Sequence, residues 1–255
     1  MSEPQSPFAS NHRPSRLAIV HLLGWMVGIG AILATFRATT NDLDYPKDWL
    51  PWLRVQQLGF GLAYGTAISG LGLFIWRWFR GQPGGPSQPG HWLLIFGGIG
   101  LIIDLTATHA LKLALHWSGI GIEFMHYGVW LFYQASVWWM AAGIATIVLT
   151  RLRDASFWWI ATTVAAMITL TLNTSVATIS FFAFMRGAAG SWMWEVPLMV
   201  RIVNILVILP ILWTAEFKDR ARGVPRDWLH GGGIAAISGL ALIDLASNLV
   251  SLSRW

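Results

Sequence analysis

Seven long apolar stretches constrain the fold of this 255-residue chain more than any other feature. Each has at least 20 residues, and a helix of that length reaches ~30 Å, the thickness of a bilayer's hydrocarbon core. The stretches are bounded by Arg, Lys, Pro or Gly, and they span residues 17–36, 55–76, 92–115, 124–149, 157–185, 196–215 and 231–252. The sequence therefore predicts an all-α, polytopic membrane protein built as a bundle of seven transmembrane helices.

Composition supports lipid as the solvent for most of the protein surface. Only 11% of the residues are charged, whereas a soluble domain has about 25%, and the mean hydropathy is +0.55. The chain has no cysteine, which excludes disulfides, iron–sulfur clusters and thiolate metal sites. The net charge of +5 does not indicate a nucleic-acid partner, because the basic residues lie in short loops between apolar stretches.

The distribution of these basic residues predicts the orientation of the bundle. With a cytoplasmic N-terminus, 10 of the 17 Lys and Arg residues fall inside, as the positive-inside rule favours: Arg13, Arg16, Arg77, Arg80, Arg151, Arg153, Lys218, Arg220, Arg222 and Arg226. An odd number of crossings then places the C-terminus outside. We expect a mobile polar tail over residues 1–16 and a single transmembrane domain over residues 17–255, in a bacterial-type inner (plasma) membrane.

Small and hydroxyl-bearing residues predict how the helices meet. The pairs Gly24-x3-Gly28 and Gly61-x3-Gly65 place glycines on one helix face, which lets two backbones approach closely. In the fifth stretch four polar residues fall near one face at 100° per residue, and we expect this face to look into the bundle: Thr162, Thr169, Asn173 and Ser180.

Ionisable side chains inside the apolar stretches are the first candidates for a functional site, because a charge at that depth is costly unless it is paired or hydrated. Asp104 and Asp244 fall near mid-membrane in the third and seventh stretches. Arg201 lies about one turn inside the sixth stretch, and its long side chain is expected to reach Asp244. Asp104, Asp244 and Arg201 are therefore the candidate catalytic residues. The alternative is an ion pair that only fixes the register of two helices.

Neighbouring polar residues extend this group. Asn204 and Asn248 lie near Arg201 and Asp244, Lys112 falls within about 80° of Asp104 on a regular helix, and Asn173 lies on the polar face of the fifth stretch. These four are the candidate substrate-binding residues. Most of the polar groups fall in the outer half of the membrane, which predicts a cavity open to the outer face between the third, fourth, sixth and seventh helices.

Histidines near the outer ends of the third and fourth stretches are candidate ligands of a metal cofactor. His109, His116, Glu123 and His126 offer nitrogen and oxygen ligands that suit copper, iron or zinc. Their spacing matches no specific metal motif, so ordinary histidines at the membrane interface are the alternative.

Three function classes follow from these features. The first is a membrane-embedded enzyme or redox subunit acting on a lipophilic substrate in the outward cavity. The second is a proton- or ion-coupled transporter of small molecules, although 255 residues is short for an alternating-access carrier. The third is a non-catalytic subunit of a membrane complex, with lipids and partner chains as its contacts. The last stretch has no lysine, which excludes a retinal Schiff base, and oligomerisation stays open.

Overall fold

The structure is a computed structural model that describes residues 19–40, 50–81, 86–118, 156–186 and 192–252. Within these ranges the secondary structure is helical, with no strand. The six helices are α1 (Ile19–Thr40), α2 (Leu50–Phe79), α3 (Pro89–Ser118), α5 (Phe157–Met185), α6 (Trp192–Ala221) and α7 (Trp228–Leu252). The predicted N-terminal tail and the fourth predicted helix, residues 124–149, lie outside the described residues.

Four of the helices are long and apolar enough to cross a membrane. These candidate spans are Pro51–Phe79, Phe157–Ser180, Glu195–Ala221 and Trp228–Val250, and shorter apolar segments occupy His21–Arg37 and Pro89–Ile103. The shortest of the four has 23 residues, which corresponds to ~35 Å along a helix axis. The expectation of several apolar helices that are able to span a membrane is therefore confirmed. The count of seven and the orientation stay predictions.

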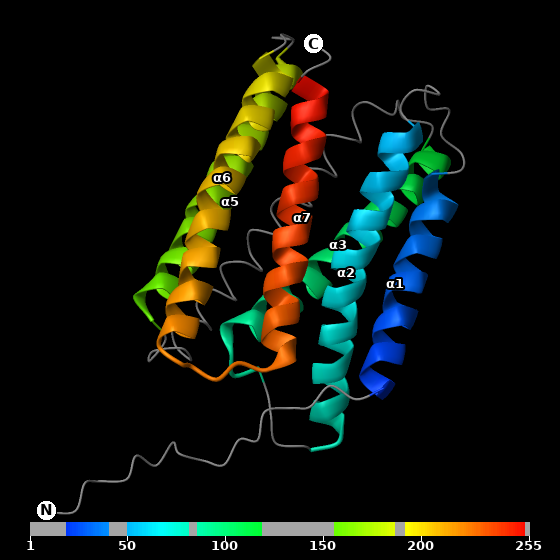
Figure 1. Cartoon of the computed structure of the whole chain (residues 1–255). Coiled ribbons are helices and arrows are strands. Elements are labelled where there is room, and N and C mark those ends of the chain that lie inside the picture. Colours follow the sequence, from blue (N-terminus) through cyan, green and yellow to red (C-terminus); the bar gives the residue numbers. More distant parts are fainter. Residues whose placement is uncertain (1–18, 41–49, 82–85, 119–155, 187–191, 253–255) are drawn as a thin grey trace, which may run out of the picture.

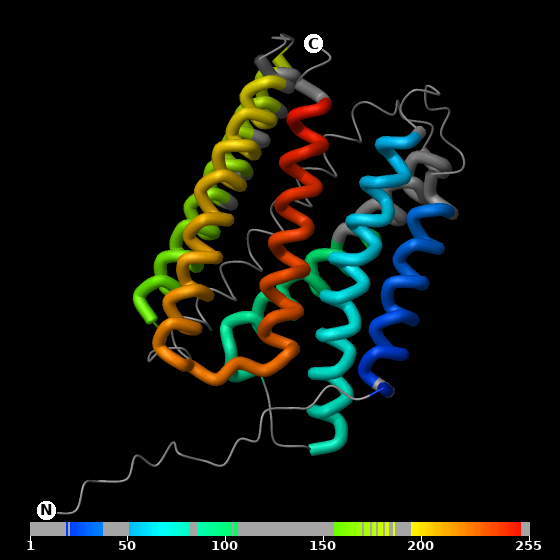
Figure 2. Tube along the Cα trace, viewed as in Figure 1, coloured from blue at the N-terminus to red at the C-terminus, as the bar shows by residue number. Residues whose placement is uncertain are grey.

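The described helices form two groups that meet along α7 (Figure 1). Helix α2 packs against α1, α3 and α7, and α3 also contacts α7. Helices α5 and α6 pair with each other, and α6 docks on α7. The trace in Figure 2 shows that α1 begins at the end of the bundle opposite the end where α7 finishes.

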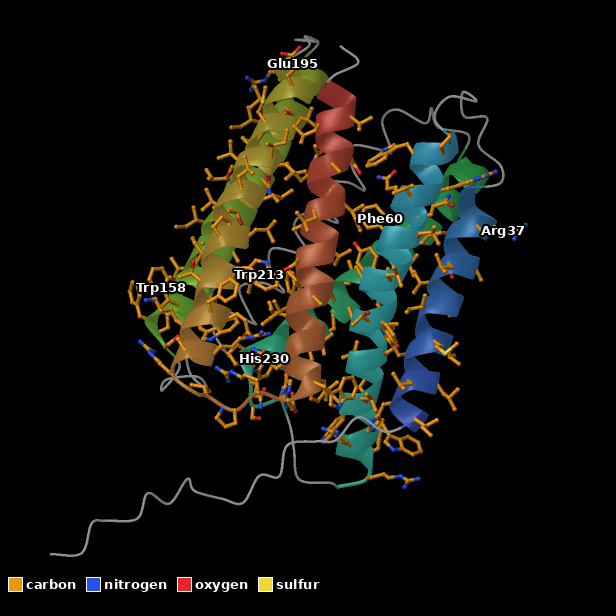
Figure 3. The ribbon with its side chains drawn as sticks, viewed as in Figure 1. Arg37, Phe60, Trp158, Glu195, Trp213 and His230 are labelled. Atoms are coloured by element: carbon orange, nitrogen blue, oxygen red, sulfur yellow. The ribbon has the colours of Figure 1, made fainter. Side chains whose placement is uncertain are left out.

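One end of the bundle is basic. The last turns of α2 and α6, together with the loop before α7, lie at the end where α1 begins (Figure 1). We call it the basic end, and define it by Arg77, Arg80, Lys218, Arg220, Arg222 and Arg226. Figure 3 shows His230 close to this end, with Arg37 and Glu195 at the opposite one. The positive-inside rule assigns the basic end to the cytoplasm, and that assignment stays a prediction.

Local chemistry at the basic end explains where α6 stops and α7 starts. Gly223 has a φ of +69°, the left-handed conformation that a helix C-terminus commonly uses and that glycine adopts without strain. Its N–H donates to Arg220 O, and the N–H of Val224 donates to Asp219 O, so the last carbonyls of α6 are satisfied. Asp227 then caps α7, because its side chain accepts the N–H of His230 at 3.0 Å.

Helices α1 and α2 meet at glycines, as their spacing predicts. A Cβ atom on Gly65 would lie 2.6 Å from Ile29 Cα, and one on Gly28 would lie 3.0 Å from Gly65 O. A Cβ on Gly61 would be 2.4 Å from a methyl of Leu33. Gly24 differs, because a Cβ there would meet nothing within 4 Å. The close backbone contact thus covers the middle of α1. Nearer the start of α1 side chains join the two helices, since Trp25 Nε1 donates to Thr66 Oγ1 at 2.8 Å and Ser69 Oγ donates to Gly24 O at 3.3 Å.

Several helices extend beyond the apolar stretches from which they were predicted. Helix α6 continues to Ala221 rather than residue 215, α7 begins at Trp228 rather than residue 231, and α2 begins at Leu50 rather than residue 55. The sequence-based bounds mark only the apolar segments, because hydropathy locates the part of a helix that suits lipid, whereas a helix ends at its caps. Charged residues such as Lys218 and Arg220 are good helix formers and continue α6 past the apolar segment.

Two apolar clusters hold the helices together near the basic end. The first joins α2, α3 and α7 through the buried side chains of Phe74, Leu94, Leu229 and Ala236. The second joins α5, α6 and α7 through Trp159, Leu212, Ala215 and Ile234, with Leu93 of α3 packed against it. Together the two clusters fix the first turns of α3 and α5 in the bundle. The cavity described below lies between these two helices.

Candidate functional site

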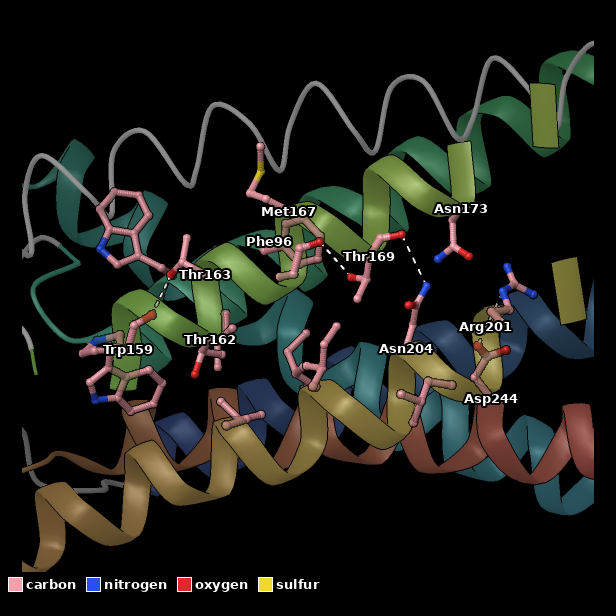
Figure 4. Close-up of a pocket in the computed structure, with 18 residues that line it drawn as sticks. Phe96, Trp159, Thr162, Thr163, Met167, Thr169, Asn173, Arg201, Asn204 and Asp244 are labelled. Atoms are coloured by element: carbon pink, nitrogen blue, oxygen red, sulfur yellow. Dashed lines mark hydrogen bonds and ion pairs between the residues drawn. The ribbon is translucent and has the colours of Figure 1, made fainter. Parts of the chain in front are cut away.

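An elongated cavity of about 280 Å³ lies between α3, α5, α6 and α7 (Figure 4). It follows α5 from Trp159 to Asn173, a distance of ~21 Å along the helix axis. Its lining residues are mostly apolar and include Leu93, Phe96, Met167, Ile205, Ile208, Leu212 and Ile237. The second apolar cluster closes the cavity toward the basic end, since Trp159 and Leu212 belong to both.

Polar side chains gather at the opposite end of this cavity. Arg201 Nε of α6 lies 3.6 Å from Asp244 Oδ2 of α7. One turn along α6, Asn204 donates through Nδ2 to the carbonyl of Thr169 on α5 at 3.4 Å. Figure 4 shows Asn173 near this group, on the α5 side. We call these four residues, Asn173, Arg201, Asn204 and Asp244, the polar end of the cavity.

The polar end keeps much of its hydrogen-bonding capacity open. Arg201 carries five N–H donors, yet its contact with Asp244, at 3.6 Å, is longer than a hydrogen bond. Within the described part of the chain, neither of these side chains has a hydrogen-bond partner, and neither does Asn173. Their side chains are partly accessible, 41% for Arg201 and 34% for Asp244. Polar groups that face an apolar cavity need an external partner, either water or a ligand.

The structure brings together four of the residues singled out from the sequence. The expected contact between Arg201 and Asp244 is confirmed, and Asn204 and Asn173 line the same end of the cavity. Asn248 does not line it. That side chain is 6% exposed, and its Nδ2 has no partner within the described residues. One turn of α7 separates Asn248 from Asp244 in sequence, but the cavity stops short of it.

Other predicted site residues are not placed by the structure. Asp104, His109, Lys112 and His116 lie on α3, but their side chains are outside the described part, as are Glu123 and His126 altogether. No group of three or more His, Asp or Glu residues among the described residues forms a metal site. The metal hypothesis for the undescribed histidines therefore stays a prediction.

The helices that surround the cavity differ in part from the prediction. The sequence suggested the third, fourth, sixth and seventh helices. Helices α3, α6 and α7 do line the cavity, and the predicted fourth helix lies outside the described residues. Helix α5 adds a whole wall. The polar face of α5 explains this, because Thr162 and Thr169 are buried at 7% and 6% exposure and line the cavity. Thr162 also donates back to Trp158 O at 2.8 Å, so its hydroxyl is satisfied within its own helix. The expectation that this face looks inward is confirmed.

A second polar group, which the sequence analysis did not predict, lies buried at the basic end. We call it the basic-end cluster and define it as His91, Glu216, Asp219, Arg226, Asp227 and His230. It joins the start of α3, the end of α6 and the start of α7. His230 is completely buried, and Glu216, Asp219 and His91 are 2 to 3% exposed.

Hydrogen bonds fix the protonation of both histidines. His230 Nδ1 accepts the backbone N–H of Gly90 at 2.9 Å, so the ring proton is on Nε2, which donates to Glu216 Oε2 at 2.9 Å. His91 follows the same pattern, with Nδ1 accepting from Gln88 N at 3.4 Å and Nε2 2.8 Å from Asp227 Oδ1. Both rings are therefore neutral donors to carboxylates, and neither forms a true ion pair.

The carboxylates of the cluster have further hydrogen-bond partners within the protein. Asp219 accepts a hydrogen bond from Trp159 Nε1 at 2.6 Å and is paired with Arg226. Glu216 also accepts from Arg220 Nε at 2.7 Å. Each buried carboxylate thus has its partners inside the protein, while Arg226 Nε is a buried donor without a partner among the described residues. The role of the cluster is to join four helix ends and to hold Trp159 across the closed end of the cavity.

One sequence signal points to part of this cluster. Asp227 precedes an apolar run and lies three residues before His230, which is the arrangement of a helix N-cap. That signal places the start of α7 correctly. It does not show that Glu216 and Gly90 approach the same histidine, because those contacts span 14 and 140 residues of the chain.

Comparisons with protein-family models, with curated proteins and with solved structures gave no match to this chain. The geometry of the cavity and of the basic-end cluster is thus the basis for a functional proposal.

Proposed function

We propose that this protein is a seven-helix inner-membrane protein that binds a lipophilic molecule with a polar head in the cavity between α3, α5, α6 and α7. The observation that carries the proposal is the division of this cavity into apolar walls and one polar end. An apolar wall with a few convergent polar groups is the usual composition of a small-molecule site. In a chain with four candidate membrane spans, such a ligand enters from the lipid.

Size and shape narrow the ligand class. The cavity volume of about 280 Å³ is nearly twice the ~150 Å³ that holds a benzene molecule. This corresponds to roughly a dozen non-hydrogen atoms by the same ratio. Because the space extends ~21 Å along α5, a long, narrow ligand fits better than a compact one. Its polar head would lie at Arg201 and its apolar part would point toward Trp159.

The chemistry of the polar end suits a head that accepts hydrogen bonds. Arg201 would hold a carboxylate, phosphate or carbonyl oxygen through its planar fork. Asp244 lies beside it and would exchange a proton with the bound head, while Asn173 and Asn204 orient it. These are the roles expected in a membrane-embedded enzyme or redox subunit that acts on a lipophilic substrate.

Filling the cavity tests this proposal. Ala166 lines the cavity on α5, and Ala166→Phe would occupy the space of the ligand's apolar part. Val164 of the same helix is 44% exposed and outside the cavity lining, so Val164→Phe is the matched control. We expect a small molecule extracted from the purified protein to be recovered with the wild type and the control. Its recovery should fall at least tenfold with Ala166→Phe, as measured by mass spectrometry.

Equal recovery from the two phenylalanine variants, or no bound molecule with the wild type, would contradict the proposal. A proton-coupled transporter is the second candidate, because Asp244 is partly accessible and only loosely paired with Arg201. The substitution Asp244→Asn separates the two. Loss of product formation with normal expression favours an enzyme, whereas loss of pH-driven uptake favours a transporter.

A further inference from the structure

A second pocket lies between α1 and α2 near the basic end, and it shares no lining residue with the cavity described above. Its volume is about 260 Å³, and its lining residues are His21, Gly24, Trp25, Ser69, Gly72, Leu73 and Trp76. We call it the α1–α2 pocket. Along α2 it extends from Ser69 to Trp76, ~10 Å along the helix axis.

The pocket lies beside the closest approach of α1 and α2. They are in backbone contact at Gly28 and Gly65, where an added Cβ would lie within 3.0 Å of the other helix. At Gly24 and Gly72 an added Cβ would meet nothing within 4 Å. Ser69 Oγ donates to Gly24 O at 3.3 Å and Trp25 Nε1 donates to a threonine of α2 at 2.8 Å, so side chains join the two helices at one end of the pocket. The other end of the pocket is at Trp76.

The Trp76 end of the pocket carries positive charge. The guanidinium of Arg80 lies 4.3 Å from the ring centroid of Trp76, a cation–π geometry that keeps the charge beside this end. Arg77 lies one residue beyond Trp76 on the last turn of α2. Neither arginine has a carboxylate partner within the described residues. None of the residues that line the pocket is acidic.

Exposed aromatic side chains place this end of the pocket at the level of the lipid head groups. Trp78 and Phe79 are each 78% exposed, and Trp76 is 55% exposed. Tryptophan is enriched where a membrane meets water. An aromatic pocket with unpaired arginines at that level has the features expected of an anionic lipid site between transmembrane helices.

We propose that the α1–α2 pocket binds an anionic phospholipid of the leaflet at the basic end. The phosphate pairs with Arg77 and Arg80, and the glycerol and upper acyl chain fill the space above Gly24 and Gly72. The charge favours an anionic head group over a zwitterionic one, because the two arginines lack carboxylate partners within the described residues.

Lipid binding by the purified full-length protein in detergent tests the proposal. The probes are phosphatidylglycerol and phosphatidylcholine with identical acyl chains, and bound lipid is counted by native mass spectrometry across a titration. We expect preferential binding of phosphatidylglycerol by the wild type. The double variant Arg77→Gln/Arg80→Gln should weaken it about 25-fold, since each arginine contributes about fivefold to the affinity for anionic lipid.

Two matched controls separate this pocket from non-specific attraction. Arg222→Gln removes an exposed charge from the same end of the bundle and should leave the binding unchanged. Gly72→Leu fills the pocket and should abolish the preference. Gly100→Leu is its control, because Gly100 on α3 also faces open space outside the pocket lining.

Three results would overturn the proposal. The first is equal binding of the two lipids by the wild type. The second is an effect of Arg222→Gln as large as that of one pocket arginine, which would indicate general charge attraction. The third is full retention of phosphatidylglycerol by a folded Gly72→Leu variant, which would place the lipid outside the pocket. Ala166 does not line the α1–α2 pocket, so Ala166→Phe should not change the binding of phosphatidylglycerol. The two proposals are therefore independent, and a negative result for the lipid would not contradict ligand binding in the cavity.

Discussion

The contact between Gly233 of α7 and Gly90 of α3 predicts a large difference between two neighbouring glycines. A Cβ atom on Gly233 would lie 1.9 Å from Gly90 O, whereas one on Gly231 would meet nothing within 4 Å. Both residues lie in the first two turns of α7. Gly233→Ala and Gly231→Ala therefore add the same methyl group to the same helix in opposite environments.

The magnitude follows from the geometry. Ordinary contact begins near 3.4 Å, so Gly233→Ala forces α3 and α7 apart by about 1.5 Å, because the obstacle is backbone that no rotamer can move. An equal shift would stretch the 2.9 Å bond from Gly90 N to His230 Nδ1 beyond hydrogen-bond range. Overpacking costs ~1–3 kcal/mol and the lost bond ~1 kcal/mol, against a gain of at most ~1 kcal/mol in helix propensity. With the full gain in helix propensity, the net loss is about 1–3 kcal/mol.

Gly231→Ala raises the helix propensity without creating a clash, so it should be neutral or stabilising by up to ~1 kcal/mol. For a chain of this size 1 kcal/mol changes the Tm by ~2–4 °C. We expect Gly233→Ala to melt ~2–12 °C below the wild type and Gly231→Ala to melt at or slightly above it. Tryptophan fluorescence at one heating rate in one detergent measures both. A Gly233→Ala variant that melts with Gly231→Ala would refute the close packing of α3 on α7.

Three further predictions concern the basic end and the topology. Glu216→Gln replaces a buried acceptor of two hydrogen bonds and should cost ~1–3 kcal/mol of stability, while Glu195→Gln, on an exposed residue, should cost almost nothing in the same melting assay. Gly223→Ala puts a side chain at a φ of +69° and should lower stability by ~1–2 kcal/mol in the same assay, whereas Gly100→Ala, at an open position inside α3, should be neutral or stabilising by up to ~1 kcal/mol. Reporter fusions at the two chain termini should report opposite compartments, and a common compartment would rule out an odd number of crossings.

Hydropathy predicted the apolar helices because burial in lipid acts on each residue separately. Long runs such as residues 231–252 must be helical, since lipid offers the backbone no other hydrogen-bond partners. The same reasoning located the polar end of the cavity, because Arg201 and Asp244 had to avoid the lipid. It left α5 out of the cavity wall, because threonines such as Thr162 and Thr169 are only weakly polar and bond back to their own helix. The predicted fourth helix lies outside the described residues.

The basic-end cluster was not predicted, although its residues are ordinary in sequence. Gly90 and His230 are far apart in the chain, and their contact depends on the crossing of α3 and α7. A hydrophobicity profile treats Glu216 and His230 as loop or interface residues, because both flank apolar runs. The structure buries them with partners instead, so their charges and protons are satisfied inside the protein.

The sequence by itself determined that the chain forms apolar helices, which residues at their ends are charged, and which buried ionisable groups must find partners. Each of these follows from the cost of placing one residue type in lipid. Only the tertiary structure decided that α5 lines the cavity, that Gly90 and Gly233 are in contact, and that a pocket lies between α1 and α2 near Trp76. Those features depend on the distances between helices, which the packing of side chains sets and no single segment encodes.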